Sequence, residues 1–415
     1  MEVSYNLRYQ KQSFGNKVLI DKEGEIIIYA KGFRLKGKGA GDKGELLNFS
    51  ELKEFYFKDK QIIFITFNKE KYILSEAGTL FEQMLIDLYK SRNTFLADAL
   101  FMKVGKLKGQ YDAYFERISK FGKPISKAKV KLCLYEGSLL LIPELQDVIA
   151  VNFNFVNFHE FDDMEYQLKI VMDDGSTIFI SQLANDYEFF EEKMNTILGG
   201  MYEDYVNGGL KEAFPEFHAG TLLKLGFKMK GGKAVSLKDI KKMDEDMAAR
   251  VEEFIFEDEV YKEKASVLRE LVDDYNIYFG IAKDEKSKDG FVKWALYSIP
   301  ENNIVAFTIL PRWESEEKFH STYFYKIIMQ QGRPAEKAAD KIREIEQALV
   351  TLKFVKDPCH KDKRDLKHSP YQYAIRKMPF LRILRKSFVG RASAVDVKQW
   401  QEQAKKIVTN ATLKN

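Results

Sequence analysis

The sequence predicts an α+β fold in which two tandem β-sheet modules are each closed by a C-terminal helix. One observation is a stretch near the start that recurs once, without gaps, 106 positions further on. Five residues with identical counterparts at this shift are Tyr29, Glu54, Phe55, Gln61 and Ser75, which reappear as Tyr135, Glu160, Phe161, Gln167 and Ser181. The other is that, in each copy, a run of strand-like segments gives way to one segment with the 3.6-residue period of an amphipathic helix. We therefore expect two copies of one module.

Length and composition indicate a multi-domain globular protein. The 415 residues allow roughly two to four domains, and 32 phenylalanines and 21 tyrosines against 9 prolines suit packed sheets. A net charge of +4 gives no reason to expect a polyanionic partner for the chain as a whole. The two cysteines fall in distant parts of the chain, the start carries no secretory signal, and charged residues interrupt the apolar stretch 138–158. We expect a cytoplasmic, soluble protein.

The first copy reads as a meander of strands closed by a helix. Its expected strands are Glu25–Ala30, Glu45–Phe49, Leu52–Phe57, Gln61–Phe67 and Lys71–Ser75, with a glycine-rich loop after the first. The turns between the later strands are short and polar, as in hairpins. Phe81, Met84, Leu85 and Leu88 then stand at helical spacing. A single amphipathic helix is predicted to close the unit.

The second copy repeats this order. Its expected strands are Lys129–Tyr135, Ser138–Ile142, Val148–Phe153, Phe155–Phe161, Tyr166–Met172 and Thr177–Ser181. Tyr187, Phe190, Met194 and Ile197 form the apolar stripe of its closing helix. The arrangement resembles the pleckstrin-homology-like (PH-like) fold in its divergent bacterial form, over about residues 15–105 and 124–200, although neither closing helix has the tryptophan that eukaryotic members carry. The resemblance implies binding more often than catalysis.

The rest of the chain is predicted to contain a helical connector and a C-terminal α+β domain. Ser236 is expected to cap a connector helix. The expected later strands are Tyr275–Ala282, Val292–Ile299, Ile304–Leu310 and Tyr323–Ile328, followed by a helix that Pro334 opens and by a last helix around Trp400. We divide the chain into residues 1–123, 124–215, 216–274, 275–358 and 359–415. The fourth part is either a domain of its own kind or a diverged third module.

Two basic segments are candidate anion or lipid sites. The first comprises Lys31, Arg34, Lys36, Lys38 and Lys43, in a glycine-rich stretch that lacks the hydroxyl and the following helix of a nucleotide-binding loop. The second comprises Arg376, Lys377, Arg382, Arg385, Lys386 and Arg391, with no acid among them. Either could bind anionic lipid head groups. The alternatives are a solvated glycine-rich hairpin for the first and, for the second, a helix docked on its own domain.

No catalytic, cofactor or metal site is predicted. Cys359, His360 and His368 have no fourth ligand at a suitable distance, and no nucleophile motif is present. We therefore expect a non-enzymatic binding or scaffold protein whose partners are other proteins. The alternatives are a peripheral membrane protein that uses the two basic segments, a nucleic-acid-binding protein, and an enzyme whose site forms between domains.

Overall fold

The computed structural model describes residues 2–39, 41–284, 287, 290–309, 321–327, 338–362, 364–366 and 369–413. The chain forms two compact units, Met1–Asn195 and Thr196–Asn415, which are called the N-terminal and the C-terminal unit below.

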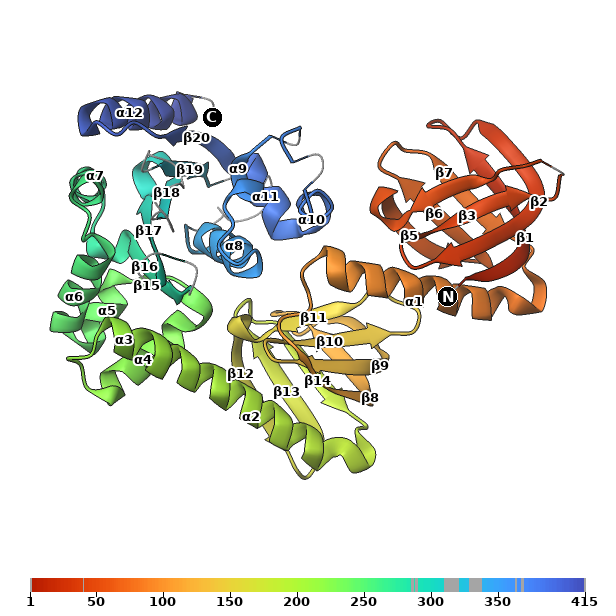
Figure 1. Cartoon of the computed structure of the whole chain (residues 1–415), viewed down its shortest axis with the longest axis horizontal. Coiled ribbons are helices and arrows are strands. Elements are labelled where there is room, and N and C mark those ends of the chain that lie inside the picture. Colours follow the sequence, from red (N-terminus) through yellow and green to blue (C-terminus); the bar gives the residue numbers. More distant parts are fainter. Residues whose placement is uncertain are drawn as a thin grey trace. The chain divides into compact units, whose positions relative to one another are not determined.

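The first module is a seven-stranded antiparallel sheet followed by a long helix (Figure 1). Its strands are β1 (Val3–Gln12), β2 (Val18–Tyr29), β3 (Gly32–Gly37), β4 (Glu45–Asn48), β5 (Leu52–Lys58), β6 (Gln61–Thr66) and β7 (Lys71–Ser75), and its helix is α1 (Phe81–Ala99). The order across the sheet is β4-β3-β2-β1-β7-β6-β5. The first strand therefore pairs with both the second and the last.

One core unites this whole sheet with its helix. Inward side chains of β1 alternate as Tyr5, Leu7 and Tyr9, and the edge strands β4 and β5 contribute Leu47 and Leu52 to the same cluster. Because both edges reach one core, the sheet must curl around it. Four residues of α1 complete the cluster, namely Met84, Leu85, Leu88 and Tyr89. The apolar stripe predicted for this helix is confirmed, and burying it against the sheet stabilises both elements.

The second module has the same construction. Its strands are β8 (Leu107–Ile118), β9 (Pro124–Tyr135), β10 (Ser138–Pro143), β11 (Ile149–Asn152), β12 (Val156–Asp162), β13 (Gln167–Met172) and β14 (Thr177–Ser181), and its helix is α2 (Tyr187–Tyr205). The order β11-β10-β9-β8-β14-β13-β12 matches that of the first sheet strand for strand. The duplication and the α+β class are confirmed, and the pair is consistent with tandem β-sandwich modules.

The claim that the repeat runs without gaps is wrong for one segment. Gln61 and Ser75 do occupy the same places as Gln167 and Ser181, because β6 and β13, and β7 and β14, keep the shift of 106. Between them, β4 and β5 match β11 and β12 at a shift of 104. In the first module Glu54 lies opposite Ile65. In the second module the residue opposite Val171, the counterpart of Ile65, is Phe158, so Phe158 and not Glu160 is equivalent to Glu54. Likewise, His159 takes the place of Phe55. The loop after β3 has two residues more than its counterpart, and the turn after β5 has two fewer.

Three strands of the two modules were not predicted from the sequence, and β15 and β20 of the C-terminal unit, described below, were not predicted either. β1 and β8 are the first strands of their modules. The buried residues of β8, Tyr111, Ala113 and Phe115, alternate with less buried ones, as the buried residues of β1 do. β8 pairs with β9, so the expected boundary at residues 123 and 124 falls inside the second sheet. β3 lies where a glycine-rich loop was expected, which was wrong. Gly32 is needed there for close approach, since a Cβ at this residue would lie 2.2 Å from the Leu47 carbonyl oxygen.

The C-terminal unit is built on a six-stranded antiparallel sheet with the order β15-β16-β17-β18-β19-β20. The strands are β15 (Val235–Ser236), β16 (Ile277–Lys283), β17 (Phe291–Ile299), β18 (Ile304–Ile309), β19 (Thr322–Lys326) and β20 (Phe388–Ala392). The helices are α3 (Lys211–Ala213), α4 (Ala219–Met229), α5 (Leu237–Met243), α6 (Glu245–Ile255), α7 (Glu259–Arg269), α8 (Ala338–Thr351), α9 (Asp357–His360), α10 (Ala374–Lys377), α11 (Pro379–Ser387) and α12 (Val397–Leu413).

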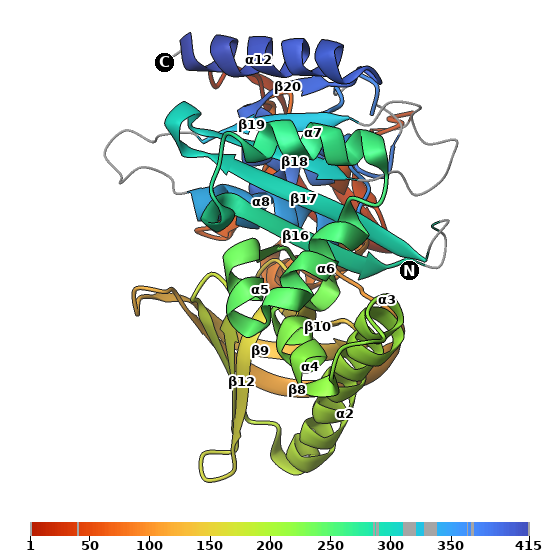
Figure 2. The same ribbon diagram turned by 90° about the vertical axis from the view of Figure 1, so that its left-hand side faces the viewer.

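Helices cover both faces of this sheet. On one face α4 to α7 and α12 share a core with β16 and β17, and Figure 2 shows α7 in front of the central strands and α8 behind them. On the other face Trp294 of β17 lies against Phe354, and Tyr323 of β19 against His360. Every residue of β17 is accordingly buried. Double coverage explains why these strands read as continuous apolar runs rather than alternating ones.

This unit does not repeat the module. Its sheet is a simple meander, whereas each module brings its first strand beside its last. The predicted helical connector, residues 216–274, is confirmed, and its helices pack on the C-terminal sheet. β20 adds part of the expected final segment to that sheet. The strand ends at Leu310 and Ile328, the helix start at Pro334, and His368 lie outside the described residues.

In the described part of the chain, no helix combines the length and the apolar character needed to cross a membrane.

Candidate functional site

A polar joint, buried at Arg92 and exposed at Asp147, links the helix of the first module to a loop of the second. Arg92 on α1 is 2% exposed, and its guanidinium donates two hydrogen bonds of 2.8 Å to the two carboxylate oxygens of Asp147. The guanidinium also lies 5.2 Å from the centre of the Phe55 ring on β5. A two-point contact between a guanidinium and a carboxylate fixes orientation as well as distance. The pair therefore sets how the loop meets the helix.

The neighbouring Asn93 serves the backbone of the same loop. Its side-chain amide donates to the carbonyl oxygens of Pro143 and Gln146, at 3.3 and 2.9 Å, and its carbonyl oxygen accepts from the Val148 amide at 2.9 Å. Leu145 packs against the core of the first module. One loop of five residues between β10 and β11 thus contributes a carboxylate, backbone groups and an apolar side chain. We call these five residues, 144–148, together with Pro143 at the end of β10, the docking loop.

The five cations of the first basic segment are distributed over β3 and the segments on either side of it. Arg34 and Lys36 lie on β3, and Lys31 precedes it. Lys36 and Lys38 form ion pairs with Glu25 and Glu23 of β2, at 3.7 and 2.7 Å. Two of the five charges are therefore offset by neighbouring carboxylates. Lys31 and Lys43 are exposed, and Arg34 is half-buried.

Asp42 holds the loop between β3 and β4 in shape. Its carboxylate accepts hydrogen bonds from the amides of Gly37 and Gly44, both at 2.9 Å, and from the ammonium of Lys22. The bond from Lys22, followed by those from the two amides, lowers the pKa of Asp42 to about 2. Gly44 adopts φ +69, a conformation that glycine reaches without strain. This loop is therefore closed by its own side chain.

Both modules expose a phenylalanine at the tip of the hairpin that joins their first two strands. Phe14 is 77% exposed and Phe121 is 78% exposed. Ser13 and Ser119 close the hairpins identically, because their amides donate to the carbonyls of Lys17 and Lys123, at 2.9 and 2.8 Å. Lys69 lies 4.4 Å from the centre of the Phe14 ring and Lys120 lies 5.2 Å from that of Phe121. The sequence analysis missed this pair, although the serines and lysines recur at the 106-residue shift.

The second basic segment is docked on its own unit. Pro379 begins α11, as expected, and Leu381 and Leu384 of this helix are buried. Arg385 donates to the carbonyl oxygens of Pro358 and Lys361, at 2.7 and 2.6 Å, and burial lowers its pKa. Arg382 and Lys386 are exposed, whereas Arg376, Lys377 and Arg391 lie on other elements, α10 and β20. The six cations thus do not share one surface role, since Arg385 serves the fold.

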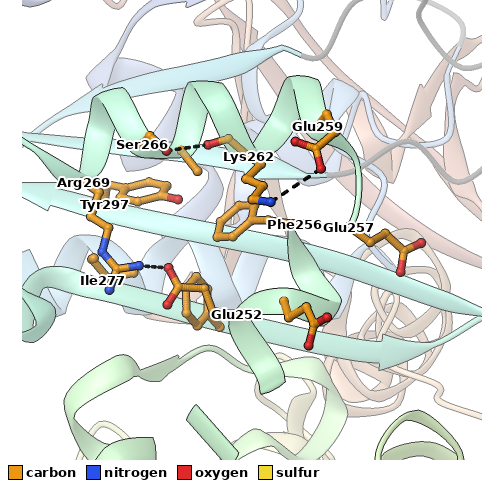
Figure 3. A pocket seen from close by; sticks show the side chains of 12 residues that line it. Glu252, Phe256, Glu257, Glu259, Lys262, Ser266, Arg269, Ile277 and Tyr297 are labelled. Atoms are coloured by element: carbon orange, nitrogen blue, oxygen red, sulfur yellow. Dashed lines mark hydrogen bonds and ion pairs between the residues drawn. The ribbon is translucent and has the colours of Figure 1, made fainter. Parts of the chain in front are cut away.

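A pocket of about 450 Å³ lies in the C-terminal unit between α6, α7 and strands β16 and β17 (Figure 3). Its floor is apolar, with Phe256, Ile277, Phe279 and Tyr297 among the lining residues. The carboxylates at its rim are Glu252, Glu253, Glu257 and Glu259. Each has a cationic partner, respectively Arg269, Arg250, Lys293 and Lys262. The Ser266 hydroxyl donates to the Lys262 carbonyl at 2.9 Å. The pocket can hold a small apolar group, and each of its carboxylates is already paired with a cation.

Two of the three residues considered as metal ligands, Cys359 and His360, are placed as packing groups. Cys359 is buried, and burial raises the pKa of its thiol to about 12. His360 has its ring 4.6 Å from that of Tyr323, and burial lowers its pKa to about 4. Over the described ranges, no three histidine, cysteine, aspartate or glutamate side chains are grouped so that they could hold a metal ion.

No protein-family model matches the chain, and no curated protein matches it either.

Proposed function

We propose that this chain is a non-enzymatic scaffold protein that binds other proteins through tandem PH-like modules. The strand order, with the last three strands folding back onto the first and one closing helix, supports the PH-like assignment. The observation that carries the proposal is the exposed edge strand of the first sheet, β5. Tyr56 and Phe57 of this strand are exposed, and Phe57 lies edge-on to Tyr89 of α1, with ring centres 6.5 Å apart.

An exposed edge strand beside a helix suits an extended peptide. Such a peptide adds a strand by main-chain hydrogen bonds, and pockets for alternate side chains give specificity. Aromatic side chains contribute much of the binding energy at protein interfaces. In the second module the corresponding edge strand, β12, exposes Phe158. Phe158 takes the place of Glu54, so the two edge strands expose aromatic side chains at different positions.

Capture of partners from a native lysate tests this proposal when matched variants are compared. We expect the wild-type chain to retain a defined protein and the double variant Tyr56→Asp and Phe57→Asp to lose it. Phe189→Asp on α2 is the control, because Phe189 is an exposed aromatic residue away from the β5 edge. Equal retention by all three chains, or no retained protein together with turnover of a small molecule, contradicts the proposal.

A second candidate function, attachment to anionic membranes, is favoured by the two hairpin tips. An exposed phenylalanine beside lysines can enter the interfacial region of a bilayer while the cations meet anionic head groups. This surface replaces the two basic segments considered from the sequence, since Lys36, Lys38 and Arg385 already have partners within the protein. Sedimentation with anionic vesicles should fall for Phe14→Ser with Phe121→Ser and at raised salt. Unchanged sedimentation of that variant excludes the tips.

A further inference from the structure

The docking loop has a structural counterpart in the first module. β10 is the counterpart of β3 at a shift of 106 residues, and β11 is the counterpart of β4 at a shift of 104 residues. Residues 38–44 therefore stand where residues 144–148 stand. Counting back from the following strand, Gly44 takes the place of Val148 and Lys43 takes the place of Asp147. The position that pairs with a buried arginine in the second module thus carries the opposite charge in the first.

The two loops are completed differently. In the second module the amide of Val148 donates to Asn93 of α1, at 2.9 Å. In the first module the equivalent amide, that of Gly44, donates to Asp42 of the same loop, also at 2.9 Å. Asp42 thus accepts the hydrogen bond within its own loop that, in the second module, Asn93 of the docked helix accepts. Asp42 holds the Gly37 and Gly44 amides without a partner protein, which lowers the ordering cost of binding one.

The outward side chains of the strand that precedes each loop also differ between the modules. Leu140 and Ile142 of β10 take the places of Arg34 and Lys36 of β3, and Leu140 is buried. The second module therefore has an apolar outer face beside a loop with an acidic contact. On the same face of the first module Lys36 is paired with Glu25, and the exposed Leu46 of β4 lies opposite Arg34. Carboxylates on a helix that also carries an apolar side chain would complement Arg34, Lys43 and Leu46.

We infer that this surface, defined by Arg34, Asp42, Lys43 and Gly44, binds an acidic helix of a partner protein in the way that the docking loop binds α1. The inference goes beyond the β5 edge and rests on the proposed function only in taking the ligand to be a protein. The closing helix α2 of a second copy is not the occupant. At the places of Arg92 and Asn93, α2 carries Leu198 and Gly199, which offer neither a carboxylate nor an amide side chain.

A charge-swap experiment tests the inference with a defined probe. The probe is a stapled helical peptide of the 19 residues of α1, in which the core-facing Met84, Leu85, Leu88, Tyr89 and Leu96 are alanine and Arg92 is replaced by glutamate. Binding to the full chain is measured by fluorescence anisotropy. We expect Lys43→Asp to weaken binding by about tenfold, because it places like charges together. The peptide that keeps Arg92 should bind the Lys43→Asp chain more tightly than the wild-type chain.

Controls separate this surface from others. Lys58→Asp changes an exposed lysine on β5 by the same charge and should leave binding of the probe unchanged. The double variant Tyr56→Asp and Phe57→Asp should also bind the probe, so failure of the β5 proposal leaves this measurement intact. No binding of the probe, or equal binding by the wild-type and Lys43→Asp chains, overturns the inference. Self-association or sedimentation with anionic vesicles that depends on Lys43 overturns it in favour of a second copy or a lipid surface.

Discussion

The two modules of the N-terminal unit share a strand order and an inward pattern, and they differ on the outer faces beside the loop that follows their third strand. The first module surrounds this loop with cations and closes it by Asp42. In the second module this face is apolar, and the loop is held by hydrogen bonds with Arg92 and Asn93 of the first module. The comparison teaches that the inward alternation maintains the fold while the outer faces are free to specialise.

The largest expected loss of stability comes from substitutions in the buried core, which has the same layout in both modules. Phe64 is fully buried, with its ring centre 4.6 Å from that of Phe33. Phe64→Ala should destabilise the first module by about 3–5 kcal/mol, because it removes a large apolar side chain and leaves a cavity. Its counterpart Ile170→Val in the second module should cost about 0.5–1.5 kcal/mol. Hydrogen exchange of the strand amides in each module measures both.

Phe14→Ala provides the control for this pair, since a mostly exposed side chain should change stability by about 0.5 kcal/mol at most. A loss of protection in Phe64→Ala no greater than in Phe14→Ala would mean that the described core is not the one that holds the sheet together.

The next effect concerns the joint, at which the modules differ. Asn93→Ala should cost about 1–3 kcal/mol, because backbone groups of the docking loop lose their partner. Gly199→Ala at the equivalent place on α2 should be neutral or stabilising by about 1 kcal/mol, since alanine favours a helix more than glycine does. Chemical denaturation of the two variants measures the difference.

A double-mutant cycle sharpens this result. Arg92→Ala and Asp147→Ala should show a coupling free energy of about 0.5–3 kcal/mol if the two side chains act as a pair. Additive effects of the two substitutions would show that the ion pair contributes no net stability to the joint.

A smaller effect is expected at the turn after β5, which has two residues in the first module and four in the second. Asp59 and Lys60 both have positive φ, of +51 and +58. Lys60→Gly should stabilise the first module by about 0.5–1 kcal/mol, because glycine adopts this conformation without a Cβ clash. Thermal unfolding should show a small rise in Tm, and a fall would indicate that the lysine side chain makes a contact of its own.

The smallest effect is confined to one loop and depends on pH. The pKa of Asp42 is lowered from 3.8 to about 2 in the folded chain, so its stabilising contribution is present above about pH 4 and is lost as the pH falls toward 2. Hydrogen exchange at Gly37 and Gly44, corrected for the intrinsic rate, should therefore increase over this range. Asp42→Asn should show faster exchange already at pH 7. A Gly44 amide whose protection does not change with either treatment would contradict the role of Asp42.

Much of the fold follows from the sequence because burial leaves a periodic trace. The closing helices were found from their apolar stripes, and most strands from their alternation. β1 escaped because only Tyr5, Leu7 and Tyr9 point inward among polar neighbours, and β3 because its glycines suggested a loop. Glu160 and Phe161 matched Glu54 and Phe55 in letters but not in place, since loop lengths are not visible without the strand pairing.

The candidate surfaces could be predicted only in part. Clusters of cations are visible in the sequence, but the carboxylates that offset them lie on a neighbouring strand, as Glu23 does for Lys38. The pairing of Arg92 with Asp147, 55 residues away, depends on how a helix meets a distant loop. No local sequence pattern predicts such a contact. The repeated hairpin with Phe14 and Phe121 could have been found, because its serine and lysine recur at the same shift as the core.

The displacement of β11 and β12 by two positions has a consequence for how such copies diverge. Neighbouring residues of a strand point to opposite sides, so an odd displacement would have turned Phe153 and Val156 outward and brought polar side chains into the interior. An even one leaves the lining intact. Whether the segment slipped or its flanking loops exchanged length, burial of these side chains constrains the parity of the change more than its size. Duplicated sheets can drift apart in sequence register by such paired steps and still be superimposable strand on strand.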